Sequence, residues 1–234
     1  MKINVLYRIS DKGRPKEKLA QATPQTCLKN AIAEFGVENI TLFADNCDES
    51  TIEMIRSLGI EPILTSLGNS GSLRHIISYA IDNLNEEEIV YLLEDDYLHK
   101  EGSAKCIVEG LGIADYVTLY DNPDKYWKKS EGGNRYVKNG GERTRVLVTE
   151  STHWKITNST TMTYACKVGT LKQDFPVWKK HSSKKTPKSF YAYRQLRTRL
   201  FGRRRILISS IPARSTHAEV AFLSPIVDWS EFRV

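Results

Sequence analysis

The sequence lacks the features that mark several large classes of protein. No run of about 18 apolar residues occurs among its 234 residues, so no membrane-spanning helix is predicted. The four cysteines are widely spaced and form no CxxC pair, which argues against zinc and favours free thiols in a cytosolic protein. The first residues enter a strand pattern without the layout of a signal peptide, so a cytoplasmic location is expected.

Acidic residues are absent from one long stretch, and the positive charge is concentrated there. The segment 179–205 holds 11 Lys or Arg residues and no Asp or Glu, whereas the rest of the chain holds 23 basic and 28 acidic residues. The formal net charge of +6 therefore comes from one local block, here called the basic segment. Such a block can bind phosphate groups, nucleic acid or an anionic membrane surface, or it can be a solvated helix and loop.

Five short apolar segments in the first half alternate with segments of helical periodicity. Continuous apolar runs are typical of strands buried on both faces, and apolar residues three and four apart are typical of helices. This order predicts a parallel sheet covered by helices, with right-handed crossovers. The expected strands are 3–10, 39–44, 62–65, 89–93 and 116–120, and the expected helices are 24–35, 50–58, 73–84 and 104–111.

The pattern changes after residue 121. Residues 125–142 are polar and rich in Gly and Lys, which is typical of a loop. Alternating segments at 145–149, 153–157 and 160–165 predict antiparallel strands, followed by a helix around 171–178 and a last strand at 206–209. We therefore expect one α/β domain over 1–234, with a mostly parallel half at 1–121 and antiparallel additions in the half at 122–234.

Three acids follow the apolar strand at 89–93. Glu94, Asp95 and Asp96 would repel one another unless a cation or protons intervened, and ligands collect outside the carboxyl ends of strands in open α/β sheets. Mg²⁺ usually binds one or two carboxylates together with substrate phosphates. The motif therefore predicts a metal-assisted phosphate site, and its alternative is a solvated acidic turn.

Two further segments could contact an anionic ligand. Arg8 falls at the carboxyl end of the first strand, where a guanidinium can pair with a diphosphate or stack on a base, or form a surface ion pair. Gly68–Ser72 is expected to be a flexible turn before the third helix, whose first N–H groups would point toward a nearby anion. The alternative for this turn is an ordinary strand-to-helix connection with Ser72 as the N-cap.

Taken together, these segments resemble the GT-A class of nucleotide-sugar glycosyltransferases. The acids Glu94-Asp95-Asp96 resemble the DXD motif of that class, with Glu in place of the first Asp. Asp45 ends the second strand, where the class often places an acid that contacts the nucleotide.

Two other segments add to the resemblance. Asn69-Ser-Gly71 resembles the turn before the helix that precedes the DXD strand. His217, in Ser-Thr-His-Ala-Glu, resembles a C-terminal histidine that some members add to the metal site.

The resemblance implies transfer of a sugar from a nucleotide-sugar donor to the hydroxyl of a glycan, a lipid-linked molecule or another acceptor. A divalent metal, Mn²⁺ or Mg²⁺, would neutralise the charge of the leaving diphosphate. Asp96 is expected to bind the metal directly, with His217 as a nitrogen ligand. Glu94 and Asp95 would contact the ribose, hold the metal through water or position Asp96.

An inverting enzyme, the course favoured here, would also need a carboxylate base for the acceptor proton. Asp174 is the first candidate because it is an isolated acid ahead of Pro176-Val-Trp178, although it could equally be a turn or N-cap aspartate. Asp121, at the end of a sheet strand, is the second candidate. A retaining enzyme would need neither as a base.

Other functions fit parts of the sequence. A sugar-phosphate nucleotidyltransferase would carry a Gly-rich, basic signature after the first strand, which Ser10-Asp-Lys-Gly-Arg-Pro15 approximates only faintly. The basic segment could cover the donor diphosphate as a lid, attract a phosphorylated acceptor or touch an anionic membrane. A non-enzymatic nucleic-acid-binding protein is the weakest alternative, because no RNP, KH or zinc-finger pattern accompanies the basic segment.

Overall fold

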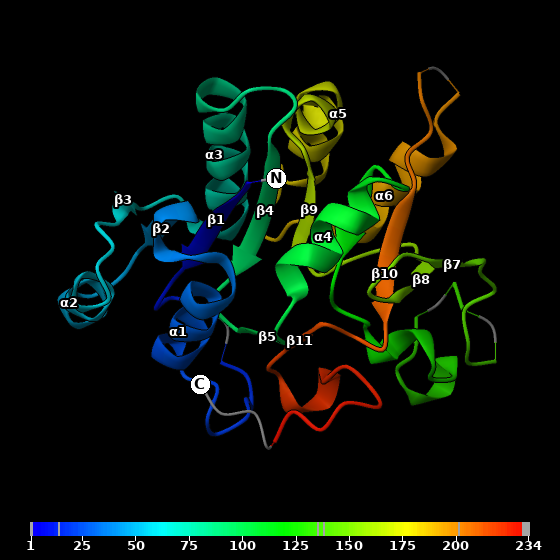
Figure 1. The fold of residues 1–234 in the computed structure, drawn as a ribbon, viewed down its shortest axis with the longest axis horizontal. Coiled ribbons are helices and arrows are strands. Elements are labelled where there is room, and N and C mark those ends of the chain that lie inside the picture. The colour runs from blue at the N-terminus through cyan, green and yellow to red at the C-terminus, as the bar shows by residue number, and fades with distance from the viewer. Residues whose placement is uncertain (1, 14, 135, 138, 201, 231–234) are drawn as a thin grey trace.

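A large mixed sheet forms the centre of the molecule in the computed structural model, which describes residues 2–13, 15–134, 136–137, 139–200 and 202–230. Arg14 and Phe201, which fall within the predicted first break and the basic segment, lie outside these ranges. The sheet order is β3-β2-β1-β4-β9-β6-β10-β8-β7 (Figure 1). Its strands are β1 Ile3–Ile9, β2 Ile40–Asp45, β3 Ile63–Thr65, β4 Ile89–Glu94, β6 Tyr116–Thr118, β7 Val146–Val148, β8 His153–Ile156, β9 Tyr164–Lys167 and β10 Leu207–Ile211.

The first four strands of the sheet run parallel. Strand β1 pairs with both β2 and β4, and β2 pairs with β3. In this register Arg8 lies opposite Glu94, and Ile9 lies opposite Ala44. Because parallel strands end at the same edge, the carboxyl ends of β1, β2 and β4 meet there, as the alternation of strands and helices predicted.

The antiparallel strands do more than extend this half. Strand β9 enters between β4 and β6 and is antiparallel to both, so β6 does not pair with β4. Strand β10 is parallel to β6, and β8 and β7 then add antiparallel pairs. The predicted class, a mostly parallel first half with antiparallel additions, is confirmed, but the five predicted strands are not one uninterrupted parallel sheet.

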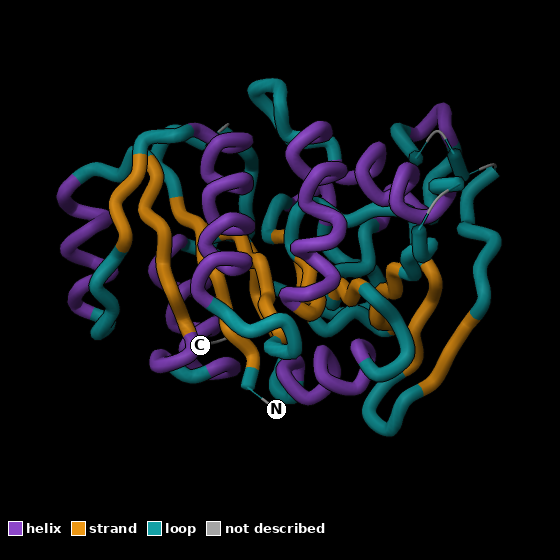
Figure 2. Tube along the Cα trace, turned by 90° about the horizontal axis from the view of Figure 1, so that it is seen from above, coloured by secondary structure: helices purple, strands orange, loops and turns teal. Residues whose placement is uncertain are grey.

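Helices cover both faces of the sheet (Figure 2). They are α1 Pro24–Phe35, α2 Glu49–Ser57, α3 Gly68–Asn83, α4 Ser103–Leu111, α5 Val168–His181 and α6 Ser189–Thr198, with short 3₁₀ turns at Val37–Asn39, Pro123–Lys125, Lys129–Glu131 and Val220–Phe222. Tyr91 packs with α1, α2 and α4 in one apolar core, whereas its neighbour Leu92 packs with α3, α5 and α6 in the other. This alternation explains why the strand sequence is apolar throughout.

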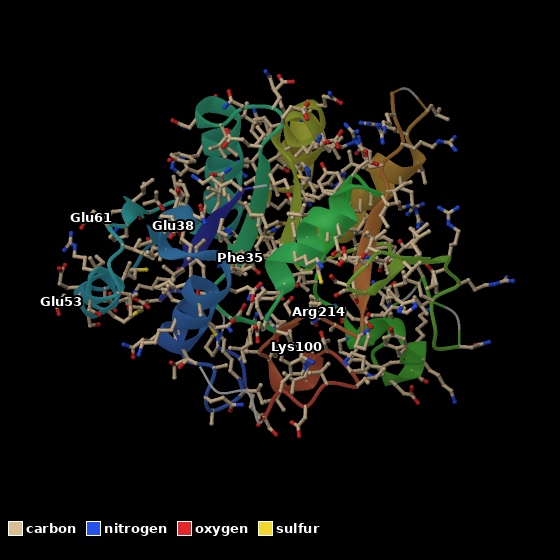
Figure 3. All side chains as sticks on the ribbon, in the orientation of Figure 1. Phe35, Glu38, Glu53, Glu61, Lys100 and Arg214 are labelled. Atoms are coloured by element: carbon tan, nitrogen blue, oxygen red, sulfur yellow. The ribbon has the colours of Figure 1, made fainter. Side chains whose placement is uncertain are left out.

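The first helix begins and ends as its sequence predicts. Thr23 accepts a hydrogen bond from the Thr26 N–H, Pro24 occupies the first helical position, and Gly36 follows the helix with φ +82°. Phe35 lies within the fold, whereas Glu53 and Glu61 project from the margin formed by α2 and the segment that leads to β3 (Figure 3).

Two predicted boundaries were wrong. Helix α3 begins at Gly68, so the predicted flexible turn at 68–72 is the first turn of the helix, and Ser72 is not its N-cap. Strand β9 begins at Tyr164 because Met162, with φ +74°, bends the chain inside the predicted strand 160–165.

All four cysteines are free thiols, as predicted. Among the helices that the structure describes, none is both long and apolar enough to cross a membrane.

Candidate active site

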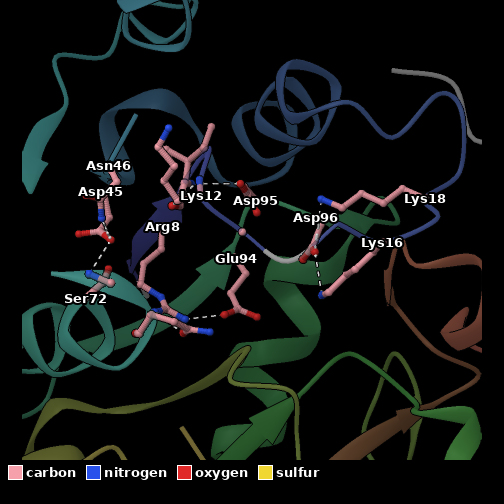
Figure 4. A pocket seen from close by; sticks show the side chains of 15 residues that line it. Arg8, Lys12, Lys16, Lys18, Asp45, Asn46, Ser72, Glu94, Asp95 and Asp96 are labelled. Atoms are coloured by element: carbon pink, nitrogen blue, oxygen red, sulfur yellow. Dashed lines mark hydrogen bonds and ion pairs between the residues drawn. The ribbon is translucent and has the colours of Figure 1, made fainter. Parts of the chain in front are cut away.

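A cleft of about 240 Å³ opens at the edge where β1, β2 and β4 end (Figure 4). Its walls come from the ends of these three strands, the loop that follows β1, and the first turns of α3. It is lined by Arg8, Ile9, Ser10, Lys12, Gly13, Lys16, Lys18, Asp45, Asn46, Gly68, Asn69, Ser72, Glu94, Asp95 and Asp96. Six of the eight residues predicted to bind the nucleotide or the metal line this cleft, whereas Gly71 and His217 do not.

Arg8 and Glu94 form an ion pair on one wall of the cleft. The pairing of β1 with β4 places them side by side, and Arg8 donates to Glu94 at 2.5 Å. Arg8 also donates to the backbone carbonyl of Asn69 at 3.0 Å, which joins α3 to the pair. Burial raises the pKa of Glu94, although Arg8 opposes the shift. Arg8 is therefore fixed at the strand end, as predicted, but its guanidinium is shared with a carboxylate.

Asp95 lies in the middle of the three acids and faces the loop after β1. Its carboxylate accepts a hydrogen bond from the Ser10 backbone N–H at 3.3 Å. Burial raises the pKa of Asp95 to about 7, and the charge of Asp96 contributes to the shift. Asp95 thus holds the beginning of this loop beside the strand end.

Asp96 and His217 meet although they are far apart in the sequence. The short strand β5 Tyr97–His99 pairs with β11 Ser215–His217, so His217 lies opposite Tyr97. The Ala218 N–H donates to the Asp96 carbonyl at 2.7 Å, and Asp96 Oδ2 lies 3.2 Å from His217 Nε2. The two-stranded pairing therefore brings together the carboxylate and the imidazole that were predicted to bind the metal.

Two lysines that sequence reasoning missed complete this corner. Lys16 Nζ lies 3.0 Å from His217 Nε2 and 3.5 Å from Asp96 Oδ2, and Lys18 Nζ lies 3.5 Å from the same oxygen (Figure 4). Burial opposes ionisation of Asp96, but His217, Lys16 and Lys18 outweigh it and hold its pKa below its usual range. The sequence does contain a sign of these lysines, because Lys12, Lys16 and Lys18 follow the carboxyl end of the first strand, where ligands bind.

The donor set fits a divalent cation. A carboxylate oxygen and an imidazole nitrogen that bind one ion at right angles, each at about 2.1 Å, are about 3.0 Å apart. Asp96 Oδ2 and His217 Nε2 are separated by 3.2 Å, and the buried Asp96 Oδ1 has no hydrogen-bond partner among the described residues. Among the described residues, three or more His, Cys, Asp or Glu side chains do not come together in a group that could bind a metal ion. Two protein donors suit an ion whose remaining ligands are substrate phosphates and water.

Asp45 fixes the first turn of α3. Its carboxylate accepts from the backbone N–H groups of Leu67 at 2.6 Å and Gly68 at 2.9 Å, and from the Thr65 hydroxyl at 2.8 Å. Burial opposes ionisation, but these bonds lower the pKa of Asp45. Asp45 therefore lines the cleft with its oxygens already engaged in capping the helix.

Gly71, predicted to contact the donor, does not line the cleft. A Cβ at this position would lie 2.9 Å from Leu67 Cβ, so the residue serves close packing at the start of α3. Its neighbour Asn69 does line the cleft.

Neither predicted base lies in the cleft. Asp174 is in α5 and fully buried, where it accepts from the Tyr116 hydroxyl at 2.8 Å and pairs with Arg205 at 2.8 Å and Arg199 at 2.9 Å. The sequence offered no sign of these partners, because the arginines come from the basic segment.

Asp121 is buried as well, in the second half of the fold. It forms an ion pair with Lys155 at 2.7 Å and accepts from the Tyr126 hydroxyl at 2.5 Å. Both predicted bases thus have their carboxylates compensated by cationic and hydroxyl partners.

Comparison with known proteins gives likeness in structure alone. No protein-family model and no curated protein matches the sequence. The structure of GalNAc-T7 with UDP, GalNAc and Mn²⁺ superposes with a TM-score of 0.56 at 10% identity, over 92% of this chain and 43% of that chain. The chain therefore spans less than half the length of that protein.

Two other solved structures score lower. A 4-diphosphocytidyl-2C-methyl-D-erythritol synthase from Anaerococcus prevotii has a TM-score of 0.49 at 10% identity, over 98% of this chain and 89% of that chain. The galactosyltransferase LgtC has a TM-score of 0.45 at 9% identity, over 82% and 69% of the two chains. Scores below 0.5 are too low to support an argument. The likeness to GalNAc-T7 and the mixed sheet establish that this chain has a GT-A-like, Rossmann-type α/β fold.

Proposed function

We propose that the protein is a metal-dependent glycosyltransferase that moves a sugar from a nucleotide-sugar donor to an acceptor hydroxyl. The observation that carries the proposal is the contact of Asp96, which lines the cleft together with Lys16 and Lys18, with His217 at 3.2 Å just outside the lining. The leaving group of such a reaction is a nucleoside diphosphate, whose charge increases as the glycosidic bond breaks. Cations at the carboxyl edge of the sheet meet that demand.

Each group around the cleft has a part in the proposal. Asp96 and His217 would hold Mn²⁺ or Mg²⁺, which would supply charge neutralisation for the diphosphate. Lys16 and Lys18 would contribute further positive charge beside the phosphates. The Arg8–Glu94 pair and the Asp45 cap would keep the strand ends and α3 rigid, and Asn69 would face the donor from the first turn of α3.

No acceptor base is assigned to Asp174 or Asp121 in this proposal. Each carboxylate is buried and paired with cations away from the cleft, so neither is available to take a proton from an acceptor bound beside the donor. Both residues are better explained as compensation for buried Arg and Lys side chains.

A thermal-shift panel tests the proposal. UDP-, GDP-, CMP- and dTDP-sugars should be compared with and without Mn²⁺, and we expect one nucleotide class to stabilise the protein only with the metal. Asp96→Asn should abolish that stabilisation, whereas Asp82→Asn, at an exposed position in α3, should keep it. Absence of any nucleotide effect, or equal behaviour of both variants, would contradict the proposed site.

A sugar-phosphate nucleotidyltransferase is the second candidate. It is favoured by the loop after β1, because Lys12, Gly13 and Lys16 of that loop line the cleft. This reaction joins a nucleoside triphosphate to a sugar 1-phosphate and releases pyrophosphate. Pyrophosphate release from such a mixture, without sugar transfer from any nucleotide-sugar, would favour this candidate over the first.

The basic segment has a divided role. Arg199 and Arg205 are bound to Asp174, and Arg203 lies 3.3 Å from Asp115, so part of its charge stabilises the fold. Lys184 and Lys185 are exposed, as are the other cations of the segment, Lys179, Lys180, Lys188, Arg194, Arg197 and Arg204. We propose that this remaining surface contacts an anionic membrane, where a lipid-linked acceptor would be found.

A further inference from the structure

Lys16 contacts the same atoms that would bind the metal. Its ammonium lies 3.0 Å from His217 Nε2, 3.5 Å from Asp96 Oδ2 and 3.7 Å from Glu219 Oε2. Lys18 lies 3.5 Å from the same Asp96 oxygen. Among the described contacts, none joins Lys18 to His217. Of the two lysines, Lys16 therefore shares both donors of the proposed metal site.

The backbone holds Lys16 in this place. The Leu19 N–H donates to the Ala218 carbonyl at 3.0 Å, and the Val220 N–H donates to the Glu17 carbonyl at 2.9 Å. Lys18 also forms an isolated antiparallel bridge with Glu219. The residues on either side of Lys18 are thus fixed to the segment that follows His217, and only the flexible side chain of Lys16 spans the distance to the donors.

An ammonium and a metal ion cannot use these donors together. A lysine ammonium has three N–H donors and no acceptor, so Lys16 is hydrogen-bonded to His217 in the tautomer that leaves Nε2 unprotonated, whereas the other tautomer donates from Nε2 to Asp96. The unprotonated nitrogen of a neutral imidazole has one lone pair, and it is the one that a metal would take. The Asp96 oxygen and the His217 nitrogen, both acceptors in this arrangement, therefore face one cation at a time.

We propose that Lys16 is an internal competitor for the metal position. Its ammonium holds Asp96 and His217 together in the ligand-free protein, and a divalent cation displaces it into the cleft, where it becomes available to the donor diphosphate. This inference rests on the proposed function, and it adds a regulatory link between metal and donor. Because metal binding frees a cation for the phosphates, the two ligands should favour each other's binding.

Removal of Lys16 should have two opposite effects. Lys16→Met should bind Mn²⁺ more tightly, on the order of tenfold, because the competing charge is gone. In saturating Mn²⁺ the same variant should bind nucleoside diphosphate more weakly, because the displaced ammonium is missing. A purely structural role for Lys16 would not separate the two affinities in this way.

The experiment measures Mn²⁺ binding directly, by calorimetry and by the electron paramagnetic resonance of free Mn²⁺. UDP, GDP, CDP and dTDP are the diphosphate probes. Lys16→Met and Lys16→Gln are compared with Lys12→Met, which removes a lysine from the same loop and cleft without removing a contact to Asp96 or His217. Thermal unfolding of each variant confirms that it is folded, and Asp96→Asn identifies binding at the proposed site.

The outcomes separate the inference from the function on which it rests. Tighter Mn²⁺ binding by both Lys16 variants than by Lys12→Met, with weaker diphosphate binding, supports the inference. Unchanged Mn²⁺ affinity in the Lys16 variants, with binding lost in Asp96→Asn, overturns the role of Lys16 and leaves the metal site intact. Equal Mn²⁺ binding by the wild type and Asp96→Asn overturns both.

Discussion

At the scale of single residues, the buried charges of this chain are compensated by partners from distant segments. Arg8 pairs with Glu94 across neighbouring strands, and Asp174 on α5 pairs with Arg205 near the start of β10. Arg8, Glu94 and Asp174 are candidates for ligand contact or catalysis in the sequence. Their ion-pair partners in the structure show which of these residues stabilise the fold and which face the cleft.

Asp174→Asn should lower the free energy of unfolding, and it should not remove a catalytic base. The substitution removes the buried carboxylate that pairs with Arg199 and Arg205, although Arg205 keeps its contact with Asp115, and loss of one partner of a buried ion pair typically costs about 3 kcal/mol or more. Urea denaturation should show this loss, and Asp82→Asn should not. A variant of wild-type stability that binds donor but transfers no sugar would instead restore Asp174 as a base.

His99 should make the free energy of unfolding depend on pH. It is 1% exposed, its Nε2 lies 2.8 Å from the Tyr91 hydroxyl, and burial lowers its pKa to about 3. Below about pH 6.5 the imidazole of His99 is protonated in the unfolded chain but stays neutral in the folded protein. Stability present above that pH should therefore decline as the pH falls, by up to about 1.4 kcal/mol per unit.

Denaturation at pH 7, 6 and 5 compares this slope between variants, because Asp95, with its pKa raised to about 7, titrates in the same range with the opposite sign. His99→Gln should have a shallower slope, because the group that titrates in the unfolded chain is gone. His153→Gln, at an exposed histidine of β8, should keep the wild-type slope. Equal slopes in all three proteins would contradict the role assigned to His99.

At the scale of elements, the cleft depends on how strand ends and helix starts are joined. The β1–β4 register sets Arg8 against Glu94, and the β5–β11 pair carries His217 to Asp96. The acids at the end of β4 could be predicted because the apolar run stops there. The β5–β11 pairing could not, since each strand has three residues and no periodicity long enough to recognise.

Asp45→Ala should loosen the start of α3. The variant loses the acceptor for Leu67, Gly68 and Thr65, and loss of a helix cap typically costs about 1–2 kcal/mol. Urea denaturation should show this loss, together with weaker nucleotide binding because Asn69 sits in the first turn. Asp48→Ala provides the matched control, because Asp48 precedes α2 without a capping hydrogen bond from its side chain.

At the scale of the whole molecule, charge and topology divide the surface. The proposed donor cleft lies at the carboxyl edge of the parallel strands, whereas α6 lies beyond β9, toward the antiparallel end of the sheet (Figure 1). The exposed cations of α6 therefore lie apart from the cleft. Under the proposed function, these cations would contact an anionic membrane while the cleft binds the donor.

Charge reversal should test this surface. Lys184→Glu combined with Lys185→Glu should weaken binding to vesicles that contain phosphatidylserine by about tenfold or more, since each basic residue near such a surface contributes about 1 kcal/mol. Vesicle co-sedimentation at two salt concentrations measures the effect, and added salt should weaken wild-type binding. The same change at Lys128 and Lys129, exposed lysines outside the basic segment, should have a smaller effect. Equal losses in both pairs would show that net charge alone matters.

The sequence by itself determined the features that depend on local pattern. Apolar runs and helical periodicity gave the α/β class, the parallel first half and the acids at the end of β4, because burial on two faces requires a continuous apolar strand. The tertiary structure decided which acids face the cleft and which cations meet them. Asp96, His217 and Lys16 come together through the pairing of short segments, and Asp174 lies on α5 outside the cleft, paired with Arg205 and Arg199. These contacts join residues far apart in the chain, whose distances follow from loop paths and packing that no local pattern specifies.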